Sequence, residues 1–168
     1  YAYESSSPLS AAPADKVPTA PVAVVLSLVG VSTLRVQITP PARSGGPSVT
    51  SYTVQWDVTS TFPATSPLAG SAVVATGAMT ELGAGGALVH DVTGLVAGQA
   101  YYMRVTATNS VGAGPATLSA PQFMVPMSAP GVPATLSVTT PTVQATPITT
   151  AAVSWTAPTS NEGSALTG

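Results

Sequence analysis

Strict alternation of apolar and polar residues predicts a β-strand with one buried face at residues 101–108, because successive side chains of a strand point to opposite sides. The apolar side consists of Tyr101, Met103, Val105 and Ala107, and the polar side consists of Tyr102, Arg104, Thr106 and Thr108. Glycine-containing turns flank the strand at 94–98 and at 112–114. We therefore interpret 94–114 as a turn, a strand and a second turn.

The same alternation, or a short β-branched run, predicts six further strands between Pro21 and Pro126. They span residues 23–28, 34–39, 52–58, 72–75, 88–93 and 116–125. Pro121 in the last of them indicates an edge strand, because proline cannot donate a hydrogen bond to a central ladder. Turn residues separate the strands and no amphipathic helix pattern occurs. These features predict an all-β antiparallel sandwich of about seven strands.

The first residues of the chain and the apolar run that follows need separate consideration. Prolines spaced through residues 1–20 exclude a helix there, and the composition is typical of a linker. The apolar run 22–31 is too short to cross about 30 Å of hydrocarbon as a helix. No basic region precedes it, as one would in a signal peptide. We expect strands in this run and no membrane span in the sequence.

Charged residues make up only 6% of the 168 residues, against 45% hydrophobic ones. The net charge of -2 offers no basic patch for a phosphate backbone, which argues against nucleic acid as a partner. The absence of cysteine excludes disulfides and thiolate chemistry. Serine and threonine supply most of the surface polarity, which suits an extracellular or glycosylated setting better than the cytosol.

Residues suited to catalysis or metal binding do not converge in the sequence. His90 and Asp91 are adjacent on a predicted strand and so point to opposite faces, and no Gly-x-Ser-x-Gly elbow is present. The carboxylates are scattered singly: Glu4, Asp15, Asp57, Glu81, Asp91 and Glu162. No pair has the spacing of an acid–base couple or a calcium loop. We expect no catalytic, cofactor or metal site, and no enzyme.

Two glycine-rich stretches and two arginines are the remaining candidates for a site. Residues 83–86 and 112–114 open no helix and precede no lysine, so hairpin turns are favoured over phosphate binding. Arg104 is expected to pair with Asp57 across neighbouring strands, and Arg43, at a loop tip, is a candidate for contact with a partner.

Three motifs, in this order and spacing, resemble the fibronectin type III module. They are Leu-Arg-Val-Gln-Ile-Thr-Pro-Pro at 34–41, Gly-Gly-Pro-Ser-Val-Thr-Ser-Tyr-Thr-Val-Gln-Trp at 45–56, and the stretch 94–114. In that stretch the family pattern is matched by Gly94, Leu95, Gly98, Tyr101, Arg104, Val105, Ala107, Asn109, Gly112 and Gly114. The resemblance implies a seven-stranded immunoglobulin-like sandwich.

The resemblance also implies roles for single residues. It gives Tyr101 the tyrosine-corner role, in which the hydroxyl bonds to backbone near the preceding turn. Ile38 and Ala97 depart from the family, which usually carries Trp and Pro at these positions. We expect Trp56 to carry more of the packing in compensation for Ile38.

A partial second copy of the pattern follows the first. Residues 133–138 resemble the first strand, 152–158 resemble the second, and Trp155 aligns with Ile38. Residues 1–14 resemble a last strand, and 140–150 are expected to form an extended loop. We therefore divide the chain into the end of a preceding module with a linker (1–19), a complete module (20–126) and the first two strands of a following, truncated module (127–168).

The favoured hypothesis is a structural or interaction protein. Tandem fibronectin type III spacers would belong to a large extracellular or cell-surface protein that assembles into a fibre, filament or surface layer. Its partners would be other modules of the same or neighbouring chains, including a homo-oligomeric fibre. Two alternatives stay open: ligand-binding modules of an adhesin or receptor, acting through loops 41–48 and 109–115, or an accessory spacer of a secreted carbohydrate-active enzyme. Residues 1–20, 59–67 and 139–150 are either O-glycosylated or simply polar loops.

Overall fold

The computed structural model describes residues 14–83, 86–139 and 151–166, and it forms β-strands with one short 3-10 turn, η1 (Thr76–Ala78). Residues 21–124 hold β1 (Pro21–Gly30), β2 (Thr33–Pro41), β3 (Ser51–Asp57), β4 (Gly70–Ala75), β5 (Thr80–Leu82), β6 (Ala87–Val92), β7 (Tyr101–Thr108) and β8 (Ala113–Met124). The predicted all-β fold is confirmed. The strand that the sequence did not indicate is β5, whose three residues are all exposed and show no alternation.

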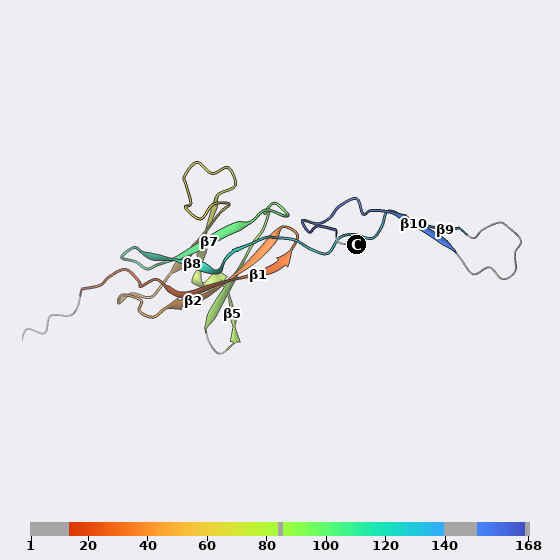
Figure 1. The fold of residues 1–168 in the computed structure, drawn as a ribbon. Helices are drawn as coiled ribbons and strands as arrows, with labels where there is room; N and C mark the ends of the chain where they lie inside the picture. Colours follow the sequence, from red (N-terminus) through yellow and green to blue (C-terminus); the bar gives the residue numbers. More distant parts are fainter. Residues whose placement is uncertain (1–13, 84–85, 140–150, 167–168) are drawn as a thin grey trace, which may run out of the picture.

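The strands form two antiparallel layers that pack face to face (Figure 1). One layer runs β4-β3-β7-β8 and the other β1-β2-β6-β5, and a single parallel bridge between Val25 and Ala120 joins them. The prediction of an edge position for the last strand is therefore wrong, since β8 has neighbours on both sides. Pro121 is tolerated because pairing with β7 is interrupted between Leu118 and Phe123, where no ladder donor is needed.

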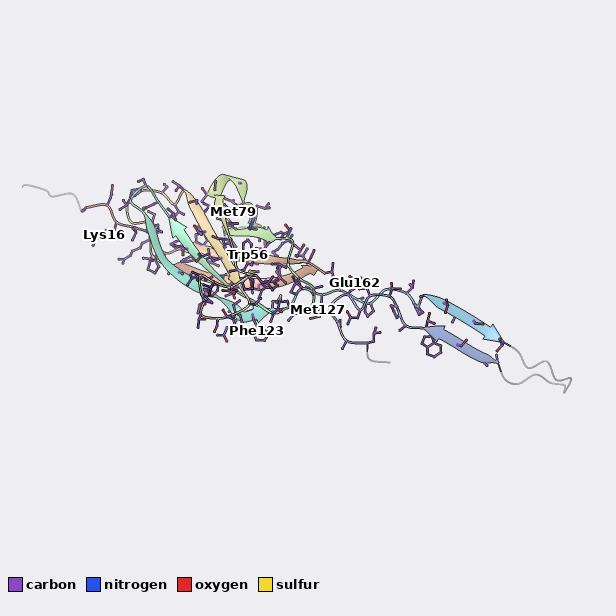
Figure 2. All side chains as sticks on the ribbon, turned by 90° about the horizontal axis from the view of Figure 1, so that it is seen from above. Lys16, Trp56, Met79, Phe123, Met127 and Glu162 are labelled. Atoms are coloured by element: carbon purple, nitrogen blue, oxygen red, sulfur yellow. The ribbon has the colours of Figure 1, made fainter. Side chains whose placement is uncertain are left out.

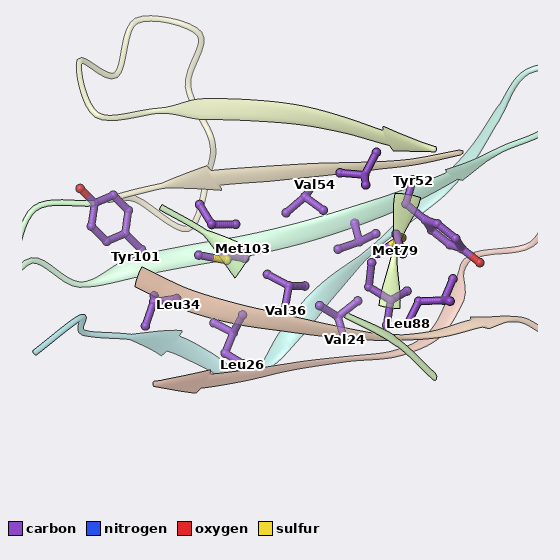
Figure 3. Close-up of a cluster of buried hydrophobic side chains, with 14 of the residues drawn as sticks. Val24, Leu26, Leu34, Val36, Tyr52, Val54, Met79, Leu88, Tyr101 and Met103 are labelled. Carbon is purple, nitrogen blue, oxygen red and sulfur yellow. The ribbon is translucent and has the colours of Figure 1, made fainter. Parts of the chain in front are cut away.

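The core fills the space between the layers (Figure 3). Its central side chains are 3% exposed or less: Val24, Leu26, Leu34, Val36 and Ile38 from one layer, and Tyr52, Val54, Tyr101, Met103 and Val105 from the other. Burial of each such aliphatic side chain contributes about 1.5–3 kcal/mol relative to exposure. Trp56 is only partly buried at the margin of this core, a smaller share of the packing than expected.

A second, two-stranded antiparallel sheet lies apart from the sandwich (Figure 1). It pairs β9 (Thr135–Thr139) with β10 (Ala152–Thr156). β10 lies within the expected stretch 152–158, and β9 overlaps the expected stretch 133–138 and ends one residue beyond it. The division into 1–19, 20–126 and 127–168 stays a prediction. The strand expected at 1–14 falls almost wholly, and the extended loop at 140–150 entirely, outside the described residues. Within the described residues, no helix is long and apolar enough to cross a membrane.

Candidate interaction surfaces

At one end of the sandwich, the turn 94–98 between β6 and β7 is held in place by hydrogen bonds. The Tyr101 hydroxyl accepts the Val96 N–H at 3.1 Å, which confirms the predicted tyrosine corner. The Leu95 N–H donates to the Ser32 carbonyl at 3.0 Å, and the Gly98 N–H donates to the Pro126 carbonyl at 2.9 Å. The turn is thus a fixed part of the sandwich, and Val96 at its tip is exposed.

At the opposite end, the buried side chain of Asn109 joins three segments. Its Nδ2 donates to the Lys16 carbonyl at 2.7 Å and to the Ser44 carbonyl at 2.8 Å. Its Oδ1 accepts the N–H groups of Val111 and Gly112 at 2.9 and 3.1 Å. The sequence showed Asn109 only as part of a turn motif, because its carbonyl partners lie far away along the chain.

This bonding brings the two candidate binding loops, 41–48 and 109–115, to the same end of the molecule. Beside the first of them lies an open groove of about 700 Å³, bordered by Asp15, Lys16 and Arg43. Arg43 therefore lies at an accessible surface, as expected for a residue at a loop tip. The groove is the candidate site for a ligand or partner at this end.

Arg104 and Asp57 do not form the predicted pair. The Arg104 Nε donates instead to Oε1 of Gln55, its direct neighbour on β3, at 2.8 Å. Its guanidinium carbon lies 4.4 Å from the centroid of the Phe62 ring, within cation–π range. Both contacts lie on the outer face of the sheet, and Phe62 comes from the loop that follows β3.

Asp57 is engaged by that same loop. It is 0% exposed, and its Oδ1 accepts the Val58 N–H at 2.6 Å, the Thr59 N–H at 3.4 Å and the Ser66 hydroxyl. Strand alternation does place Asp57 on the outer face with Gln55, but the loop 58–69 folds back over it. The carboxylate thus anchors a loop, and the predicted pairing with Arg104 is wrong for that reason.

Arg35 and Asp91, neighbours on β2 and β6, form the ion pair that the sequence did not single out. Arg35 donates from Nε to Oδ1 at 2.7 Å and from Nη2 to Oδ2 at 2.8 Å. Hydrogen bonds from Arg35 hold the pKa of Asp91 below its ordinary value; partial burial opposes this shift, and the charges of Arg35 and His90 add to it. The available signal was that each residue alternates with the inward side chains of its strand: Arg35 lies between Leu34 and Val36, and Asp91 precedes Val92.

His90 faces away from Asp91 on β6, as the alternation predicted, and is partly buried opposite Val36. In residues 14–83, 86–139 and 151–166, no three His, Cys, Asp or Glu side chains come close enough to hold a metal ion. Residues 109–112 connect β7 with β8 as a hairpin, and the Asn109 N–H donates to the Gly112 carbonyl at 3.1 Å, so that the stretch 112–114 lies at the end of this turn and the start of β8. This turn has the structural role predicted for it.

A model of the fibronectin type III domain matches residues 19–123. The chain belongs to the fibronectin type III family. The match begins just before β1 and ends within β8, so it spans the sandwich and leaves β9 and β10 outside. The motifs at 34–41, 45–56 and 94–114 are the features by which this fibronectin type III module was expected from its sequence.

Known proteins are similar to part of this chain. "Ankyrin repeat and fibronectin type-III domain-containing protein 1" from Danio rerio is 38% identical over 109 residues, which are 65% of this chain and 7% of that protein. Domains A168–A170 from titin are 22% identical, with 65% of this chain and 32% of that chain covered and a TM-score of 0.48. The FN5 domain of Drosophila Lar is 18% identical, with 61% and 97% covered and a TM-score of 0.42.

Proposed function

We propose that this fibronectin type III module is a structural spacer in a tandem array. The array would belong to a large extracellular protein that assembles into a fibre, filament or surface layer, with other modules of the same or neighbouring chains as its partners. The observation that carries the proposal is the second hairpin, β9–β10, which repeats the first hairpin of the complete module.

The repeat extends to the pairing register of the strands. When Pro133 is aligned with Pro21, and Trp155 with Ile38, corresponding residues are partners in both hairpins. The first hairpin pairs Val24 with Ile38 and Leu26 with Val36, and the second pairs Leu136 with Trp155 and Val138 with Val153. A slip of one residue in either hairpin would move every side chain of that strand to the other face. The agreement in register therefore supports the interpretation that each hairpin is the beginning of a module.

A backbone contact outside the strands repeats as well. The Lys16 N–H donates to the Gly45 carbonyl at 2.8 Å, and the Ser128 N–H donates to the Glu162 carbonyl at 3.0 Å. Lys16 and Ser128 each lie five residues before the aligned prolines, and Gly45 and Glu162 each lie seven residues after Ile38 and Trp155. The loop after each second strand thus folds back on the segment before each first strand in the same way.

One face of the second hairpin is apolar and uncovered. Leu136, Val138, Val153 and Trp155 share this face and are 70, 60, 50 and 66% exposed. An open cavity of about 410 Å³ lies beside Trp155. In the complete module the corresponding face of β1–β2 is covered by β3 and β7. This comparison supports a similar sheet, from another part of the array, as the partner that covers the apolar face of β9–β10.

The surface chemistry also supports a structural role. Three of the charged groups described above are engaged within the module: Arg35 with Asp91, Asp57 with Ser66, and Arg104 with Gln55. We infer on this basis that the module itself has no catalytic role. Low charge lessens repulsion between copies packed side by side, and serine and threonine suit an extracellular surface.

O-linked glycans on the loop 59–67 would show as hexose-containing peptides in mass spectra of the native protein.

Electron microscopy of the native protein tests the spacer proposal. We expect ordered fibres, filaments or a lattice with a repeat along the chain direction. Isolated monomers under every condition would contradict it.

The groove beside Arg43 favours the second candidate, an adhesin or receptor module that binds a ligand there. In that case Arg43→Ala would abolish binding to the cell surface without altering assembly.

A further inference from the structure

Two turns from opposite sides of the junction between the sandwich and the second hairpin meet backbone to backbone. They are residues 96–98, between β6 and β7, and residues 161–163, after β10. A Cβ atom on Gly163 would lie 2.5 Å from the Gly98 nitrogen, and one on Gly98 would lie 3.3 Å from the Gly163 Cα. Glycine at both positions therefore allows an approach that a side chain on Gly163 would prevent.

Each of the two turns is held by its own hydrogen bonds. The tyrosine corner and the bond from Leu95 to Ser32 fix the turn 96–98 on the sandwich. In the other turn, the Ser164 N–H donates to the Asn161 carbonyl at 2.9 Å and the Gly163 N–H donates to the Asn161 Oδ1 at 3.2 Å. Two preformed surfaces thus meet, so that little ordering is needed for the contact.

The connection between the two parts is clamped on both sides of one residue. The Pro126 carbonyl accepts the Gly98 N–H at 2.9 Å, and the Ser128 N–H donates to the Glu162 carbonyl at 3.0 Å. Only Met127 lies between these bonded residues (Figure 2). A linker with one unclamped residue leaves little freedom for the second hairpin to rotate about the sandwich.

We propose that the turn 96–98 is a docking surface for the glycine turn that follows the second strand of the next module, so that consecutive modules are joined at a fixed angle. The inference rests on the proposed tandem array. The complete module carries Gly45 and Gly46 where the second hairpin carries Glu162 and Gly163, all four with positive φ. The glycine turn that docks thus has positive φ at both positions in both copies, as a repeated joint requires.

The variant Gly163→Asn tests the joint. Asparagine tolerates the positive φ of 80° at this position better than other residues do, so its main effect is a Cβ atom that collides with Gly98. Gly94→Asn is the matched control, since Gly94 has a φ of 75° and nothing within 4 Å of its Cβ position. Neither change removes a hydrogen-bonding side chain.

Nitrogen-15 NMR of the full chain supplies the measurement. In the parent chain we expect the sandwich and the β9–β10 segment to tumble together and the Ser128 amide to be protected from exchange. Gly163→Asn should separate the two tumbling times and speed exchange at Ser128 about fivefold to tenfold, as for the loss of one hydrogen bond. Gly94→Asn should change neither quantity.

Independent tumbling of the two parts in the parent chain, or the same result for both variants, would overturn the proposed joint. Such a result would not decide whether the array exists, which electron microscopy tests separately. Ordered fibres built from freely rotating modules would contradict the joint alone. If the junction is rigid but no ordered fibres are found, the spacer proposal is contradicted and the proposed docking surface is supported.

Discussion

The two hairpins of this chain, β1–β2 and β9–β10, have the same strand register and opposite burial. Val24 and Ile38 are 2% and 0% exposed in the first hairpin, while their counterparts Leu136 and Trp155 are 70% and 66% exposed in the second. The difference lies in the covering sheet, which the first hairpin has in β3 and β7. Pairing register is thus a local property of the hairpin sequence, whereas burial depends on strands that come later in the chain.

The largest expected effect follows from substituting the matched residues of the two hairpins. Ile38→Ala should lower the free energy of unfolding of the sandwich by about 2–5 kcal/mol, because it leaves a cavity between packed sheets. Trp155→Ala should change it by less than about 0.5 kcal/mol, because an exposed side chain away from the sandwich has no cavity to leave. Urea denaturation of the full chain followed by circular dichroism measures both. Equal losses would contradict the comparison.

A smaller effect is expected at the corner of the covering sheet, which has no counterpart in 127–168. Tyr101→Phe removes the hydroxyl that accepts the Val96 N–H and should cost about 1–3 kcal/mol of stability. Tyr102→Phe is the control, since that ring is partly buried on the other face, beside Phe123. Its loss should be within about 0.5 kcal/mol. Thermal unfolding of the two variants gives the comparison, and an unchanged midpoint for Tyr101→Phe would argue against the corner's contribution.

The smallest effect concerns the ion pair between Arg35 of the first hairpin and Asp91. The second hairpin has Ala152 at the position that corresponds to Arg35. Because the pKa of Asp91 is lowered in the folded state, the pair stabilises the fold above the ordinary aspartate pKa of about 3.9. This contribution is lost as the pH falls through the lowered folded-state pKa. The side chains are 42% and 37% exposed, so solvent screens the pair and the effect is small.

Melting temperatures measured from pH 7 to pH 2 test this linkage. Arg35→Gln should make the melting temperature fall less steeply toward acid pH. Arg104 donates to Gln55 and not to a carboxylate, so Arg104→Gln should leave this slope as in the parent chain. A flattened slope in Arg104→Gln, or an unchanged one in Arg35→Gln, would assign the acid sensitivity to another carboxylate.

The features that the sequence predicted are those fixed by neighbours along the chain. Alternation identified the core strands, and the resemblance carried by residues 94–114 implied the corner at Tyr101. Other features depend on residues brought together only by folding. Asp57 is buried because a later loop covers it, and Asn109 binds carbonyls from two distant segments. The strand β5 carries no alternation, and the contact between Gly98 and Gly163 has no pattern in the sequence beyond the presence of glycine.

The central claim is that β9–β10 corresponds to β1–β2, the first two strands of a sandwich whose other strands are β3 to β8 in the complete module. Residues 39–51, which precede Tyr52 in the complete module, and residues 156–168 are equal in length. A second copy of residues 52–126 fused directly after Gly168 should therefore complete the module. The control is the same fusion with Trp155→Ser, which places a hydroxyl in the expected core.

Hydrogen exchange of β9 and β10, followed by mass spectrometry, is the most direct measurement. We predict that the fusion protects both strands and adds a second cooperative unfolding transition, and that Trp155→Ser weakens both effects. Exchange in β9 and β10 as fast in the fusion as in the parent chain would contradict the account.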